Sequence, residues 1–136
     1  MLRKKLCMSE QTSAAASPSQ RAWRFYIDDM IGFAANVLTY TAGQDQAGFE
    51  KSRLHYDATV RNLELIGEAA SHVPTHVRDF APQIPWRLII ATRNRLIHGY
   101  LGIDNDTLWS IVRDDTPSLL TELLVLKKAA DSGMLA

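Results

Sequence analysis

Apolar residues recur along most of this chain at intervals of three and four, the spacing that places side chains on one face of a helix. The first such stretch begins at Ser17 and Pro18, a capping serine followed by a proline at the first helical position. We therefore predict one long helix from Pro18 that ends at Gly43. Its apolar face comprises Trp23, Ile27, Met30, Ile31, Ala34, Val37, Leu38 and Thr41.

A second long helix is predicted after Ser52, which can cap it, with residues 44–51 forming a turn and a short helical piece around Phe49. From Leu54 onward the apolar positions cover a wide arc, as expected of the central helix in a bundle. Gly67 and two nearby alanines are small, which would allow a neighbouring helix to approach closely.

The next part of the chain is interrupted by Pro74 and Pro82, so residues 73–83 are expected to form a short helix or a turn. Pro85 then opens another helix at its first position, and Gly99 is the natural end of that helix. The residues that we expect this helix to bury are Trp86, Leu88, Ile89, Ile90 and Ala91.

Two further helices are predicted in the last third, the first capped by Asp104 or Asn105 and the second opened by Pro117. No stretch alternates apolar and polar residues over a length that would indicate a strand. The sequence therefore predicts an all-α bundle of about five main helices over residues 18–132. Residues 1–17 are polar and small, and are expected to form a disordered tail.

Composition limits the classes of function. The 136 residues carry 15 basic and 15 acidic side chains, whereas a strong non-specific nucleic-acid binder usually has a basic excess. An RNA substrate would therefore be met transiently by a local patch. No apolar run approaches the length of a membrane span, and the opening MLRKKL lacks the features of a secretory signal. We expect a cytoplasmic protein that makes no membrane contact.

Neither a metal site nor a cofactor is predicted. The single cysteine, Cys7, cannot form an intrachain disulfide, and no zinc-binding spacing is present. His72 and His76 are four residues apart, as two metal ligands on a helix could be. However, Pro74 lies between them and no third ligand is close in the sequence.

Chemically useful side chains concentrate near the end of the helix that Pro85 opens. Asn94 and His98 would lie one turn apart, and the long side chain of Arg93 could reach the same patch. A guanidinium can bind two phosphate oxygens, and an imidazole can move a proton near neutral pH. These are the two tasks of a ribonuclease that uses the 2′-OH of RNA as its nucleophile.

The same residues also have structural interpretations. His98 could bind the free carbonyls at a helix end, Arg93 could be a solvated surface residue, and Tyr100 could be a packing residue. Glu64 and Glu68 are one turn apart, and they could form a salt-bridged surface stripe with a preceding arginine. Alternatively, either glutamate could support the site by orienting an Arg or a His.

The sequence resembles a known family over about residues 21–130. The stretch RNRLIHGY (residues 93–100) is similar to the Arg-x4-His-x-Tyr motif of the HepT-like branch of the HEPN superfamily. The phrases RNLELIGEAA (residues 61–70) and IPWRLIIATRN (residues 84–94) occur in the family's order and spacing. So does a tail that runs from Trp109 through Asp115 to Pro117.

The resemblance implies a metal-independent endoribonuclease that is the toxin of a toxin–antitoxin pair and forms a homodimer. It implies that Arg93 and His98 are the catalytic pair, with Asn94 as the polar residue that follows the arginine. Tyr100 takes the position of a tyrosine that the antitoxin, a minimal nucleotidyltransferase of the MntA type, modifies with AMP.

Two interpretations of function remain at this point. In the first, the chain is the ribonuclease toxin, with Arg93 and His98 catalytic. In the second, it is a non-catalytic helical module that docks a nucleotidyltransferase partner. The intact Arg-x4-His spacing favours the enzyme, and toxicity of the chain expressed alone would separate the two.

Overall fold

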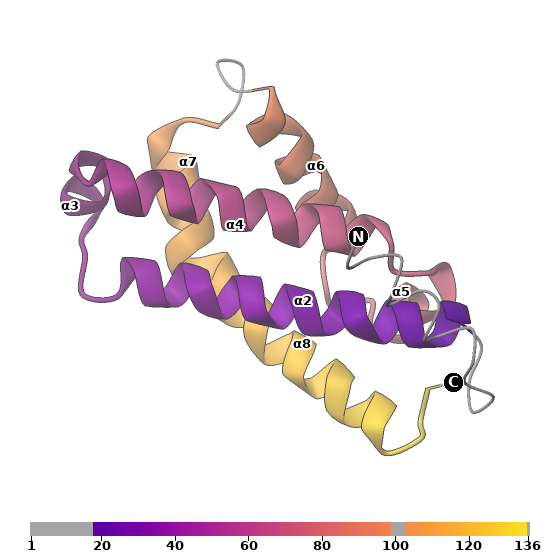
Figure 1. Cartoon of the computed structure of the whole chain (residues 1–136). Coiled ribbons are helices and arrows are strands. Elements are labelled where there is room, and N and C mark those ends of the chain that lie inside the picture. Colours follow the sequence, from indigo (N-terminus) through magenta and orange to yellow (C-terminus); the bar gives the residue numbers. More distant parts are fainter. Residues whose placement is uncertain (1–17, 99–102, 136) are drawn as a thin grey trace, which may run out of the picture.

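The computed structural model describes residues 18–98 and 103–135, and every regular element in these ranges is a helix. The predicted tail at residues 1–17, as well as Gly99 and Tyr100, lie outside the described residues. In chain order (Figure 1), the elements are α2 (Pro18–Thr41), α3 (Gln46–Lys51), α4 (Arg53–Ser71), α5 (Thr75–Phe80), α6 (Trp86–Ile97), α7 (Asn105–Ser110), a π-helical turn (Ile111–Asp115) and α8 (Thr116–Asp131). The all-α prediction is confirmed.

Helices α2 and α4 form an antiparallel pair at the centre of the bundle (Figure 1). The ring of Tyr26 stacks on that of His72, and ten residues further along α2 the Asn36 amide donates to Asn62 Oδ1 at 3.1 Å. The predicted apolar face of α2 is confirmed. Its fully buried members are Trp23, Ile27, Met30, Ala34 and Val37.

Helix α8 packs against α2 and is joined to it by ion pairs at its far end. Lys127 Nζ lies 2.9 Å from Asp28 Oδ1, and Arg24 pairs with Asp131. Arg24 also donates to the carbonyl of Ala130 at 3.2 Å. Since such partly exposed pairs each contribute little, the packing of the apolar faces carries most of the stability of this contact.

The chain turns after α2 and forms a short helix around Phe49, as the sequence predicts. Gly43 follows α2 with a φ of 74°, a conformation that favours glycine, and Phe49 is buried on the short helix α3. Ser52 does precede α4, but its hydroxyl contacts the ring of His55 and gives α4 no side-chain cap.

Helix α6 is less buried than its sequence suggests. Pro85 is the residue before the helix instead of its first residue, and Trp86 is the only buried residue of α6, with its indole N–H donating to the carbonyl of Ala81 at 3.1 Å. The prediction that Leu88 and Ala91 are buried is wrong, because both are exposed. Since α6 packs extensively only on α4, much of its circumference is left to solvent.

The last two predicted helices are not separate. The π-helical turn joins α7 to α8 without a break, so the two helices are continuous, and Pro117 stands in the first turn of α8. Proline has no N–H to donate and its ring crowds the carbonyl four residues earlier, and a wider π turn relieves that crowding. The Thr116 hydroxyl donates to the carbonyl of Ile111 at 2.9 Å across this turn.

The start of α7 is as expected. The carboxylate of Asp104 accepts the backbone N–H of Thr107 at 2.8 Å, which caps the helix. This backbone hydrogen bond, together with one from the Thr107 hydroxyl, holds the pKa of Asp104 below its usual value. In the part of the chain that the structure describes, we find no helix with the length and apolar character needed to cross a membrane.

Candidate functional site

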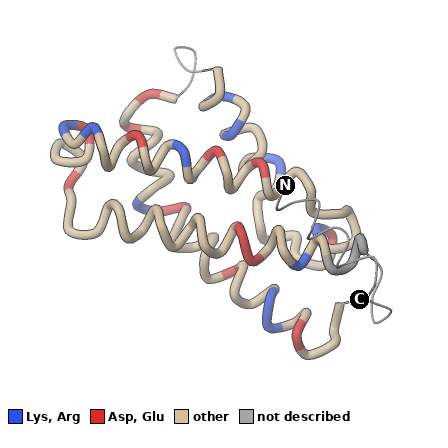
Figure 2. Tube along the Cα trace, viewed as in Figure 1, with Lys and Arg blue, Asp and Glu red and all other residues tan. Residues whose placement is uncertain are grey.

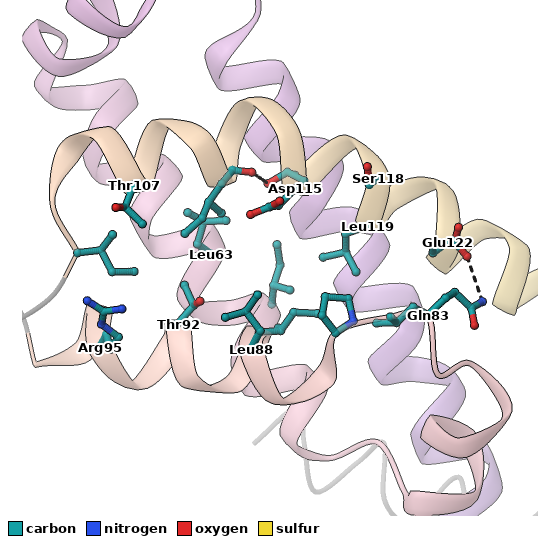
Figure 3. A pocket seen from close by; sticks show the side chains of 17 residues that line it. Leu63, Gln83, Leu88, Thr92, Arg95, Thr107, Asp115, Ser118, Leu119 and Glu122 are labelled. Carbon is teal, nitrogen blue, oxygen red and sulfur yellow. Dashed lines mark hydrogen bonds between the residues drawn. The ribbon is translucent and has the colours of Figure 1, made fainter.

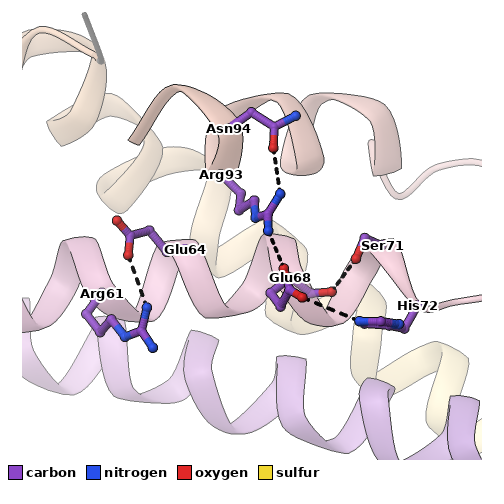
Figure 4. A network of polar contacts seen from close by, with 7 residues as sticks. All are labelled: Arg61, Glu64, Glu68, Ser71, His72, Arg93 and Asn94. Carbon is purple, nitrogen blue, oxygen red and sulfur yellow. Dashed lines mark hydrogen bonds and ion pairs between the residues drawn. The ribbon is translucent and has the colours of Figure 1, made fainter. Parts of the chain in front are cut away.

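A polar cluster lies between α4 and α6, on residues that the sequence analysis singled out (Figure 4). Arg93 Nη2 donates to Glu68 Oε2 at 2.5 Å, and Arg93 Nη1 donates to Asn94 Oδ1 at 2.8 Å. The guanidinium is therefore fixed by a carboxylate from the neighbouring helix and by an amide from its own helix.

The close approach of the two helices depends on Gly67. A Cβ atom placed on Gly67 would lie 2.2 Å from Arg93 Cβ and 3.0 Å from the carbonyl oxygen of Ile89. Any larger residue would therefore push α6 away from α4. Because Glu68 follows Gly67 directly, the same close crossing brings its carboxylate to Arg93.

Arg93 is held but remains accessible. Its side chain is 30% exposed, and its Nε is buried without a hydrogen-bond partner among the described residues. Each terminal nitrogen carries two N–H groups, so hydrogen-bond donors remain beyond those that Glu68 and Asn94 accept. The arrangement suits a guanidinium that binds an anion from solvent without first having to be ordered.

The second oxygen of Glu68 faces His72, which follows the last residue of α4. His72 Nε2 lies 3.4 Å from Glu68 Oε1, and its ring stacks on Tyr26 with 4.7 Å between ring centroids and 16° between planes. From the sequence, His72 was a candidate only for metal binding, together with His76. Its four-residue spacing from Glu68 is the signal that would have paired the two.

Glu64 is placed differently from Glu68. Its carboxylate pairs with Arg61 at 3.3 Å along α4 itself (Figure 4). Of the two glutamates, Glu68 thus contacts the candidate arginine. Glu64 forms an ion pair within α4, as expected of a salt-bridged stripe.

His98 lies at the C-terminal end of α6 and is exposed. Its backbone N–H donates to the carbonyl of Asn94 at 3.4 Å. His98 is five positions after Arg93, which corresponds to roughly 7.5 Å of rise along the helix. Tyr100, the expected site of modification, lies outside the described residues.

An apolar cavity of about 430 Å³ lies on the side of α6 that faces α7 and α8 (Figure 3). Leu63 of α4, Leu88 of α6 and Leu119 of α8 contribute to its wall. At one end Gln83 donates to Glu122 at 3.0 Å. Arg93 does not line this cavity, so the apolar cavity and the polar cluster are separate features.

The charge on α6 is uniformly positive. Its only charged residues are Arg87, Arg93 and Arg95, whereas α4 carries acidic and basic residues intermixed (Figure 2). Such a helix is the kind of local basic patch that an overall neutral chain would need for RNA. Within residues 18–98 and 103–135, no group of three or more His, Cys, Asp or Glu side chains could hold a metal ion.

Comparisons with known proteins agree with the resemblance seen in the motifs. Residues 30–126 match the family described as Ribonuclease HepT-like. The chain is 42% identical over 109 residues to the protein named probable ribonuclease HepT of Thermococcus cleftensis, which covers 80% of this chain and 99% of that protein. It is 33% identical over 108 residues to the candidate RNase MJ1380 of Methanocaldococcus jannaschii, with 79% and 99% covered. No solved structure matches the chain significantly.

Proposed function

Because the chain belongs to the HepT-like ribonuclease family, we propose that it is a metal-independent endoribonuclease in which Arg93 and His98 act on the phosphodiester. The observation that supports this role most directly is that the Arg93 side chain is both held in place and partly exposed. Its guanidinium is fixed by Glu68 and Asn94, yet part of it faces solvent on a helix whose other charges are also positive.

The chemistry needs only groups that the chain itself supplies. The Arg93 guanidinium binds the phosphate and stabilises the charge that builds up when the ribose 2′ oxygen attacks phosphorus. His98 transfers a proton during the same displacement. The bond from phosphorus to the 5′ oxygen breaks, and the products are a 2′,3′-cyclic phosphate and a 5′-hydroxyl.

The proposed enzyme is a homodimer. Leu88 and Ile97 of α6 are 60% and 53% exposed, which is unusual for large apolar residues beside a catalytic helix. Leu88 also borders the apolar cavity. A second copy that covers the Leu88 side of α6 would bury that side chain and place two Arg93–His98 sets in one cleft.

Regulation by a nucleotidyltransferase antitoxin is part of the same proposal. Tyr100 follows His98 by two residues, so an AMP group attached to its hydroxyl would put an anion near the basic end of α6. That anion would compete with RNA for the Arg93 guanidinium. RNA cleavage that persists undiminished in fully modified protein would contradict this mode of control.

The experiment that tests the function is cleavage of total RNA by purified, unmodified protein in excess EDTA. We expect the native chain and a His76→Ala control to cleave, and a His98→Ala variant of equal folded content to lose cleavage. No cleavage by the native chain would refute the enzyme and favour a helical module that docks a nucleotidyltransferase.

A further inference from the structure

Arg87 is a charged residue of α6 that the proposed mechanism does not use. Its side chain is exposed, and it makes no ion pair or side-chain hydrogen bond with any described residue. It stands in the first turn of α6, which holds no acidic residue, and the dipole of a helix disfavours a positive charge at that end. The stability of α6 therefore does not account for this arginine.

Arg87 lies on the same side of α6 as Asn94 and His98. Asn94 is seven positions after Arg87, which is nearly two full turns, and His98 follows Asn94 by four positions. All three residues are exposed. The side chain of Asn94 accepts a hydrogen bond from Arg93 at 2.8 Å, so the guanidinium that is proposed to bind the phosphate is held on this same side. We call it the Asn94 side of α6.

The Asn94 side is separate from the side that borders the apolar cavity. Leu88 and Arg95 both line the cavity, and each follows Arg87 or Asn94 by one position, which places it about 100° further around the helix. A second copy on the Leu88 side would thus leave the Asn94 side open. Ala91 lies between Arg87 and Asn94 and is exposed and small, so a strand could approach the helix closely there.

The charges on the two helices favour a path along α6 over one along α4. On α4, Glu64 and Glu68 present carboxylates beside the Arg93 contact (Figure 4), whereas the charged residues of α6 are all arginines. Carboxylates repel phosphates, and arginines bind them. Arg87 is six positions before Arg93, a rise of roughly 9 Å, so the two guanidinium groups can hold two different phosphates of one strand.

We propose that a strand of RNA runs along the Asn94 side of α6, and that Arg87 binds a backbone phosphate one or two nucleotides away from the one that is cleaved. This inference rests on the proposed function. It makes the substrate an RNA of several nucleotides instead of a single phosphodiester. Because the contact is with the backbone, Arg87 adds affinity without a preference for any base.

The first test measures binding to an oligonucleotide that carries 2′-O-methyl groups throughout and so cannot react. We expect Arg87→Gln to lower the affinity by about 10-fold, as for the loss of one charge-assisted contact. The slope of log K against log salt concentration should become shallower by about 0.7, the value for one phosphate contact on a single strand.

Arg113→Gln is the matched control, because it removes the same charge from an exposed position on the π-helical turn. This variant should keep the native affinity and the native salt dependence. An Arg87→Gln protein with the affinity and slope of the native chain would overturn the inference. So would an equal loss in both variants, because net charge alone would then explain it.

The second test compares two substrates of different length. A dinucleotide with one phosphodiester can engage Arg93 and His98 but cannot reach Arg87. We therefore expect Arg87→Gln to lower kcat/KM by about 10-fold on an oligonucleotide, and the difference from the native chain to disappear on the dinucleotide. An equal loss on both substrates would overturn the inference, because Arg87 would then act by disturbing the site itself.

Failure of the inference is distinguishable from failure of the proposed function. If the native chain cleaves neither substrate, the proposed function fails. If the native chain cleaves the oligonucleotide and Arg87→Gln cleaves it equally well, only the inference fails. Cleavage of the oligonucleotide alone would support an extended site, and the salt dependence of binding then decides whether Arg87 belongs to it.

Discussion

Glu64 and Glu68 are the same residue type, one turn apart on the same helix, yet their environments differ. Glu68 contacts Arg93 and His72 from α4, whereas among the described residues Glu64 pairs along its own helix with Arg61. From their positions in the sequence alone, Glu64 and Glu68 were equally good candidates to contact the site. The tertiary structure separates them, because Glu68 stands next to Gly67, where α4 and α6 cross closely, and its carboxylate reaches Arg93 there.

At this scale we predict that Glu68→Gln lowers kcat/KM by about 10- to 100-fold, because an arginine that is displaced by about 1 Å loses much of its effect on the reaction. The glutamine can still accept a hydrogen bond, but it lacks the charge that holds the guanidinium. Steady-state kinetics on a defined RNA is the measurement, with Glu64→Gln as the matched control. A faster Glu68→Gln enzyme would show that Glu68 restrains Arg93 instead of supporting it.

At the scale of the elements, the crossing of α4 and α6 is what builds the site. The two helices meet closely because Gly67 has no side chain, and this places Arg93 against Glu68. The rest of α6 is only lightly packed, with Leu88 and Ile97 exposed. The position of α6, and with it the geometry at Arg93, therefore depends on its packing against α4.

We predict that Gly67→Ala destabilises the fold by about 1–3 kcal/mol, the usual cost of overpacking, and lowers RNA cleavage at the same time. Urea unfolding measured beside activity would test this. The control is Gly32→Ala on α2, where an added Cβ meets nothing within 4 Å. That change should stabilise the fold by about 0.5–1 kcal/mol, since alanine is the better helix former. Unchanged stability and activity in Gly67→Ala would contradict the role given to this crossing.

At the scale of the whole molecule, one side of α6 is left uncovered by the part of the chain that the structure describes. The apolar cavity and the exposed Leu88 lie on that side, next to a helix that carries only positive charges. A single copy thus has both an unburied apolar surface and a proposed catalytic pair spread along one helix. Association of two copies would resolve both features.

We expect light scattering at micromolar concentration to give twice the mass of one 15.2 kDa chain. Leu88→Glu should shift the protein to monomer and lower cleavage, because a charge would replace an apolar side chain at the contact. Leu54→Glu, at a leucine near the start of α4 that is even more exposed than Leu88, should leave the dimer unchanged. A native chain that is monomeric under these conditions would refute the dimer.

The sequence by itself determined the features that depend on neighbouring residues. Apolar spacing and the signals at Pro18, Gly43 and Asp104 predicted helices where the structure has them, because capping and turn geometry are local. The motif from Arg93 to Tyr100 likewise indicated the family, which the match over residues 30–126 shows.

Only the tertiary structure decided which side of each helix is covered and which side chains meet. The exposure of Leu88, the continuous helix through Pro117 and the contact of Glu68 with Arg93 were not predictable from spacing. A helical pattern shows that a face is apolar, but not whether another element lies against it. Whether two helices pack together depends on how closely their backbones can approach. For α4 and α6, Gly67 allows the close approach.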